Sequence, residues 1–236
     1  MGCLTVFKSK NTVSKANRLF ATQLKKGKTD MQCKCIDFFL DTEEKKKRGC
    51  FKPSGWTIED YCAHVQSIVD SLNLKQRAIA KIGLDESQIS EIPPVFLSSF
   101  QRRDTQYCKT NEEQTKFVTE KYYATWIFFS ATQIYTYTYV LDTTSDDSTE
   151  TTRDFFYTDV TCIRTEHEVE EAIYEQKKGC GCLKKKRSKY IHQNRHWDSL
   201  QITVPNDSYS FYCRTTETLE QTIQAAKAMI REKKQA

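Results

Sequence analysis

The densest group of chemically active side chains in this sequence is basic and lies late in the chain. Between positions 177 and 195 there are eight cationic residues and no acid: Lys177, Lys178, Lys184, Lys185, Lys186, Arg187, Lys189 and Arg195. Cationic side chains near a membrane attract anionic headgroups at about 1 kcal/mol per residue. If this stretch is a loop between strands, these residues form an anion- or lipid-binding site. The alternative is a solvated loop without a partner.

The same stretch contains four residues of the types that bind zinc. Cys180 and Cys182 precede His192 and His196, and two thiolates with two imidazoles can form a tetrahedral site. The histidine spacing suits such a site, whereas Cys-x-Cys is tighter than the common pair. Zinc is therefore a candidate cofactor, but the interpretation we favour is loop cysteines with no bound metal.

Two features near the N-terminus also have a chemical interpretation. Cys33, Cys35, Cys50 and Cys62 contain the ligand type of a zinc site but lack its usual CxxC pairs, so we interpret this region as a basic linker with unrelated thiols. The opening residues partly resemble a dual-acylation start, with Gly2 for myristate and Cys3 for palmitate. Val6 stands where the usual hydroxyl residue belongs, so we favour an ordinary initiator segment.

The sequence has no catalytic signature. It contains no GxSxG, GxGxxG, GxxxxGK[ST] or HExxH motif. The eleven acids of segment 141–175 are more typical of a solvated charge run than of paired catalytic carboxylates. Nucleic acid is an unlikely partner, because no RNP-type or KH pattern accompanies the aromatic residues. We therefore predict that the protein is not an enzyme.

Composition indicates a polar protein with segregated charge. The 236 residues are 38% hydrophobic and carry a net charge of +5, and the mean hydropathy is −0.67. No run approaches the roughly 20 apolar residues of a transmembrane helix, and the first residues lack the apolar core of a secretory signal. We expect a cytoplasmic protein, peripheral to a membrane if the basic stretch binds lipid, with most of its ten cysteines reduced.

Residues 122–141 are the strongest structural signal among the elements that must position these residues. Ile134, Thr136, Thr138 and Val140 alternate with Tyr135, Tyr137 and Tyr139 after the polar break 130–133. Period-two alternation places each set on its own sheet face and predicts a hairpin. Further strands are expected at 95–100, 155–163, 200–204 and 209–213. Segment 101–120 is expected to be a polar connection, 169–174 is ambiguous between strand and helix, and 177–189 is predicted to be a loop insertion.

Helices are expected on both sides of these strands. Apolar spacing predicts a helix from Ile58 to Leu72 capped by Thr57, and a shorter one from Lys75 that ends at Gly83. A short, poorly capped helix is expected within residues 1–30. The C-terminal helix follows Thr215 or Thr216 and has Leu219, Ile223, Ala226 and Ile230 as its apolar stripe.

This order of elements resembles a known superfold over residues 93–236. The hairpin Trp126 to Tyr139, the strand Phe156 to Val160 and the terminal helix are similar to those of bacterial pleckstrin-homology-like (PH-like) and GRAM-like domains. The resemblance implies an antiparallel β-barrel or half-barrel that a C-terminal helix closes. We thus expect an α+β protein, with a basic N-terminal segment and helical region over residues 1–92 and a PH-like domain over 93–236.

The resemblance implies binding and no catalysis. The leading hypothesis is a non-catalytic cytoplasmic binding module that contacts an anionic surface, namely membrane lipid headgroups, through the basic loop. Members of this superfold usually bind lipid through an early loop, whereas this one comes late. The alternatives are a protein–protein adaptor that uses a sheet edge or the groove by the C-terminal helix, and a small metal-stabilised structural protein.

Overall fold

The computed structural model describes residues 15–40, 55–89, 92–102, 104–110, 116–178, 187–213 and 217–235. Its helices are α1 (Lys15–Leu24), α2 (Asp30–Leu40), α3 (Ile58–Ser71), α4 (Leu74–Ile82), the 3-10 turn η1 (Glu86–Ile89) and α5 (Glu217–Gln235). Its strands are β1 (Ile92–Phe100), β2 (Cys108–Thr110), β3 (Phe117–Thr119), β4 (Lys121–Phe129), β5 (Gln133–Asp142), β6 (Ser148–Phe156), β7 (Cys162–Lys178), β8 (Arg187–Val204) and β9 (Asp207–Cys213). The expected α+β class is confirmed.

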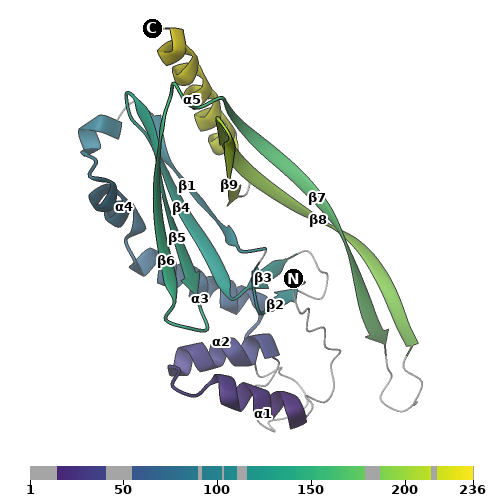
Figure 1. Ribbon diagram of the computed structural model, residues 1–236. Coiled ribbons are helices and arrows are strands. Elements are labelled where there is room, and N and C mark those ends of the chain that lie inside the picture. The colour runs from purple at the N-terminus through teal and green to yellow at the C-terminus, as the bar shows by residue number, and fades with distance from the viewer. Residues whose placement is uncertain are drawn as a thin grey trace.

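The described strands form three antiparallel sheets that do not close into a barrel. The main sheet has the order β1-β4-β5-β6, the second has the order β7-β8-β9, and β2 pairs with β3 alone. Figure 1 shows α3 and α4 on one side of the main sheet, with α5 and the β7-β8-β9 sheet on the other. The described strands therefore do not form the closed version of the expected barrel or half-barrel, because the two larger sheets stay separate.

The main sheet separates two hydrophobic clusters, as its alternation predicts. Tyr137 and Tyr139 of β5 face α3 and α4 and pack with Val69 and Ala78. Ile134, on the other face, packs with residues of α5, β7, β8 and β9. This confirms the expected division of the aromatic hairpin into two faces, since successive strand residues point to opposite sides.

The helix ends predicted from capping residues are confirmed at the start of α3 and the end of α4. The Thr57 side chain accepts from the Asp60 N–H while Asp60 caps the Thr57 N–H, which completes a capping box at the start of α3. Gly83 ends α4 in the left-handed conformation at φ 78°. No described helix has the length and apolar content needed to cross a membrane.

Four sequence expectations need correction. α2 occupies part of the supposed basic linker, because Cys35 and Phe38 lie in a core cluster with Tyr61 of α3. The expected strand 155–163 is broken by a turn between β6 and β7, and segment 101–120 contains the short β2–β3 hairpin. The ambiguous segment 169–174 is strand, and the expected loop insertion 177–189 begins and ends inside the paired strands β7 and β8.

A buried carboxylate fixes the junction between the helices and the main sheet. Glu120 precedes β4 and is 1% exposed, and its carboxylate accepts the backbone N–H groups of Gln106 and Tyr107 at 2.5 and 2.9 Å. Burial raises the pKa of Glu120, partly offset by these hydrogen bonds. Nearby, the Tyr61 hydroxyl donates to the carbonyl of Thr119 at 2.8 Å, which ties α3 to the same junction. The hydrogen bond between Tyr61 and Thr119 thus joins the two predicted domains, and their boundary at residue 92 remains a prediction.

Candidate functional sites

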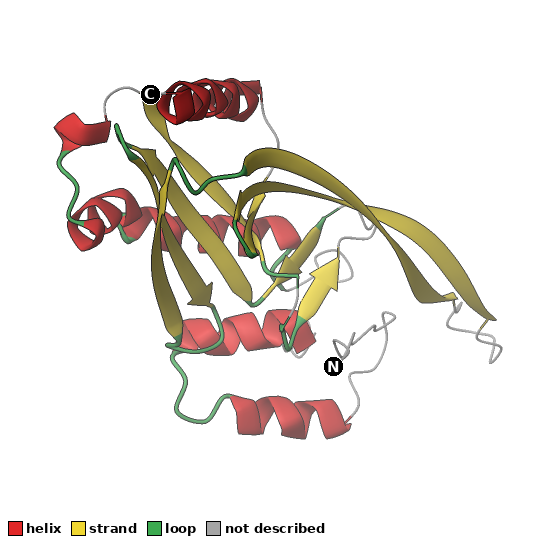
Figure 2. Ribbon diagram, turned by 45° about the horizontal axis from the view of Figure 1, so that its top comes forward, coloured by secondary structure: helices red, strands yellow, loops and turns green. Residues whose placement is uncertain are grey.

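The longest feature of the fold is a two-stranded projection built by β7 and β8. The two strands pair continuously from Cys162–Thr203 to Lys178–Arg187, whereas β9 pairs with β8 only between Asp198 and Val204. Beyond that point the ladder has two strands; we call residues 168–178 and 187–197 the arm. At ~3.3 Å per residue the arm is roughly 33 Å long. Figure 2 shows it running clear of the rest of the protein.

The sequence-predicted basic residues belong to this arm and its end. Lys177 and Lys178 are the last residues of β7, and Arg187 and Lys189 are at the start of β8. Arg195 lies nearer the body, opposite Glu170. Lys184, Lys185 and Lys186 fall in the connection 179–186, outside the described residues, and for 170–197 the structure describes the backbone alone. The anion-binding site therefore remains a prediction.

We call residues 177–189 the arm tip. The tip contains seven of the eight predicted cationic residues and no acid. Antiparallel pairing forces this clustering, because Lys177 stands opposite Ser188 and Lys178 opposite Arg187. Glu171 and Glu175 lie on β7 closer to the body, so the charge along the arm changes from mixed to wholly positive at its end.

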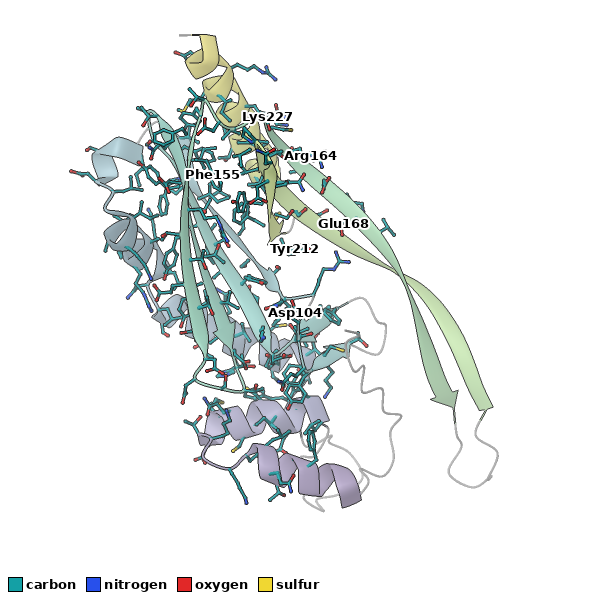
Figure 3. All side chains as sticks on the ribbon, in the orientation of Figure 1. Asp104, Phe155, Arg164, Glu168, Tyr212 and Lys227 are labelled. Atoms are coloured by element: carbon teal, nitrogen blue, oxygen red, sulfur yellow. The ribbon has the colours of Figure 1, made fainter. Side chains whose placement is uncertain are left out.

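Side chains that the sequence did not single out join the base of the arm to the body. Arg102, which follows β1, donates through Nη1 to the Glu168 Oε2 at 2.7 Å. Its guanidinium also lies over the ring of Tyr212, 5.8 Å from the centroid. Figure 3 shows Glu168 on the arm and Tyr212 on β9 at this junction. In the residue pair just before the arm, His167 Nδ1 lies 2.7 Å from Asp198 Oδ1.

Removal of the Arg102 side chain is expected to loosen the base of the arm. Arg102 is only 9% exposed at its side chain, so Arg102→Ala loses packing on Tyr212 as well as the ion pair with Glu168. If these contacts stabilise the base of the arm by about 1 kcal/mol, amide hydrogen exchange in residues 164–169 should become roughly five times faster without them. Exchange followed by mass spectrometry measures this.

The matched control is Lys116→Ala, which removes an exposed ion pair with Glu59 elsewhere on the protein. Exchange in residues 164–169 should not change in that variant. Equal rates in wild type and Arg102→Ala would mean that the arm is held by its backbone ladder alone.

The candidate zinc residues are only partly within the described chain. His192 and His196 lie on β8, opposite Ile173 and Val169, while Cys180 and Cys182 fall outside the described residues, so this site remains a prediction. No group of three or more potential metal ligands occurs among the described residues.

The thiols of the second zinc candidate occupy two helices. Cys33 and Cys35 lie on α2 and Cys62 on α3, whereas Cys50 lies outside the described residues, as do Gly2 and Cys3. Cys35 is fully buried, and this burial raises the pKa of its thiol to about 11. It is therefore a protonated core residue.

A cleft on the inner face of the main sheet was also not foreseen from the sequence. It has a volume of about 670 Å³ and lies between strands β4, β5 and β6 and the neighbouring strand β9. Thr125, Thr138 and Thr151 stand side by side across its floor. Only the alternation of Thr138 with tyrosines hinted at a polar patch, and the long-range register that completes it is not readable from local sequence.

Comparison of the chain with protein-family models, with curated proteins and with solved structures finds no significant similarity.

Proposed function

We propose that this protein is a non-catalytic binding module whose arm contacts an anionic surface, namely membrane lipid headgroups. The proposal is supported by four described residues of the predicted site, because Lys177, Lys178, Arg187 and Lys189 lie at the far end of the arm. On a flat protein face, the surrounding surface limits how closely a cation can approach a membrane. Cations held roughly 33 Å out on a two-stranded arm can meet the headgroups together.

The chemistry of the tip supports this choice of partner. Lys184, Lys185, Lys186 and Arg187 are consecutive, so that four charges fall within one short stretch. At about 1 kcal/mol for each cation near an anionic leaflet, they would contribute about 4 kcal/mol together. That free energy corresponds to roughly a thousandfold in the binding constant.

The PH-like resemblance is part of the proposal as a hypothesis about fold. It is supported by α5, which follows the last strand and packs its Ile223 and Ala226 against the main sheet cluster. The open arrangement of the three sheets weighs against it. The proposed activity does not depend on this resemblance, since it rests on the arm.

Co-sedimentation with liposomes tests the proposed function. At low salt the chain should sediment with vesicles containing phosphatidylserine and not with pure phosphatidylcholine vesicles, and physiological salt should weaken the binding. Changing Lys184, Lys185, Lys186 and Arg187 to Gln should reduce binding roughly a thousandfold. This variant and wild type would be compared across a lipid titration.

A charge-matched control separates the tip from the overall net charge. Changing Lys227, Arg231, Lys233 and Lys234 on α5 to Gln removes the same four charges from another part of the protein. This variant should retain most of the binding. An equal loss of vesicle binding in the two variants would show a nonspecific charge effect. If wild type did not sediment with anionic vesicles, the proposal would be overturned and a protein partner favoured.

A further inference from the structure

The inner face of the main sheet changes in character from one end of its strands to the other. At one end Phe129, Ile134 and Phe155 are buried under α5 and the neighbouring sheet. Toward the other end the same face presents Thr125, Thr138 and the residues paired with them. Strands that bury both faces normally read as apolar runs. Hydroxyl side chains in these places instead line the cleft.

Strand β9 makes the wall of the cleft above this floor. The guanidinium of Arg153 lies over the ring of Tyr209, 5.0 Å from its centroid. The Phe155 ring is tilted at 55° to that of Tyr209, with 5.1 Å between the centroids. Residues 208–212 all contribute to the lining, so both alternating sides of β9 border the space. β9 is the outer strand of its sheet, and the cleft follows that edge.

The lining is dense in hydroxyl groups. Ten of its side chains carry one: Tyr123, Thr125, Thr138, Ser148, Thr149, Thr151, Ser208, Tyr209, Ser210 and Tyr212. A hydroxyl donates one hydrogen bond and accepts up to two. Thr125 and Thr138 hydrogen-bond to each other at 3.0 Å, which leaves acceptor capacity on both. Burial raises the pKa of Tyr123, helped by the nearby Tyr212 and Asp104, so its hydroxyl keeps its proton at neutral pH.

The charges of the cleft are balanced and partly engaged. Lys121 and Arg153 face Asp142 and Asp147 around the lining, which gives no net charge. The Lys121 ammonium donates to the carbonyl of Asp104 at 3.0 Å, and the Arg153 guanidinium lies over the Tyr209 ring. An anionic ligand would therefore meet as much negative as positive charge, which disfavours nucleotides and acidic sugars.

We propose that this cleft binds a neutral saccharide of about two sugar units. A sugar presents many hydroxyl groups and no charge, which matches a hydroxyl-rich and electrically balanced lining. Tyr209 and Tyr212 would pack against its C–H faces, and Thr138 and Thr151 would hydrogen-bond its hydroxyls from the floor. The volume of about 670 Å³ lies within the ~300–1,000 Å³ range of small-molecule sites. This role goes beyond the arm and does not depend on it.

Saturation-transfer NMR with a panel of neutral disaccharides tests the inference. Maltose, cellobiose, lactose and N,N′-diacetylchitobiose would be offered to the full chain at millimolar concentration, with AMP and a heparin disaccharide as anionic probes. At least one neutral disaccharide should bind, and the anionic probes, which the arm tip can bind, should not displace it. No binding by any neutral disaccharide, or its displacement by the anionic probes, would overturn the proposal.

Paired threonine variants locate the binding. Thr138→Val with Thr151→Val removes two floor hydroxyls while keeping the shape of each side chain, and should weaken disaccharide binding about tenfold or more. The control, Thr132→Val with Thr152→Val, makes the same change at two exposed residues outside the lining and should bind as wild type. Circular dichroism of both variants checks that the fold is retained, and equal affinity in the two would place the sugar elsewhere and refute the site.

Discussion

A chain in which Asn-Gly replaces residues 170–195 is expected to fold normally and to lose its binding to anionic vesicles. Val169 and His196 stand directly opposite each other in the β7–β8 ladder, so a two-residue turn can join them, and Asn-Gly suits such a turn. Among the described residues, the removed backbone pairs only within the arm. The free energy of unfolding should therefore change by only about 1 kcal/mol, since a long hairpin is replaced by a short closure.

Thermal unfolding and liposome co-sedimentation of the same preparation measure the two halves of this expectation. The midpoint temperature of thermal unfolding should shift by a few degrees. Sedimentation with phosphatidylserine vesicles should fall to the level seen with phosphatidylcholine vesicles. A folded variant that still sediments would place the membrane contact on the body. An unfolded variant would mean that the arm is a structural element.

A carboxylate at position 223 is expected to destabilise the whole protein. Ile223 is 2% exposed and lies in the cluster that joins α5 to the main sheet and to β7, β8 and β9. Ile223→Asp would place an unpaired charge in that cluster, at a cost of roughly 4 kcal/mol or more. Since typical domains are stable by ~5–15 kcal/mol, this loss would remove a large share of the free energy of unfolding.

Urea unfolding followed by tyrosine and tryptophan fluorescence measures the loss. Ile223→Ala should lower the free energy of unfolding by about 2–4 kcal/mol, less than the aspartate variant does, because it leaves a cavity and no charge. Gln224→Asp is the matched control, since Gln224 is the next residue of α5 and is exposed. If the two aspartate variants were equally stable, α5 would not be packed against the sheets as described.

Local chemistry explains which parts of the fold were predictable from the sequence. Thr57, Asp60 and Gly83 mark helix ends by interactions within a few residues, and the alternation of Ile134 and Tyr135 fixes sheet faces without reference to other strands. α2 was missed because its apolar residues, including Phe38 and Phe39, form a nearly continuous run beside basic positions. Its burial depends on packing with residues of α3.

The candidate sites divide in the same way. A run of four basic residues is visible in the sequence, so the tip was identified before its arm. Arg102 and Glu168 are 66 positions apart, and only the fold brings them together. The cleft floor likewise needs the register that sets Thr125 beside Thr138 and Thr138 beside Thr151. Such long-range pairing leaves no local pattern.

The two-stranded arm also has a consequence for solubility. Beyond Asp198 the arm gains no third strand among the described residues, so both of its edges present backbone groups that another chain's strand can pair with. The sequence places Glu168, Glu170, Glu171 and Glu175 on β7, and like charges on two approaching arms repel. Concentrated salt screens this repulsion together with the attraction of the tip for anions. Conditions that release the protein from a charged surface are thus also those that favour joining of two copies, edge to edge, through their arms.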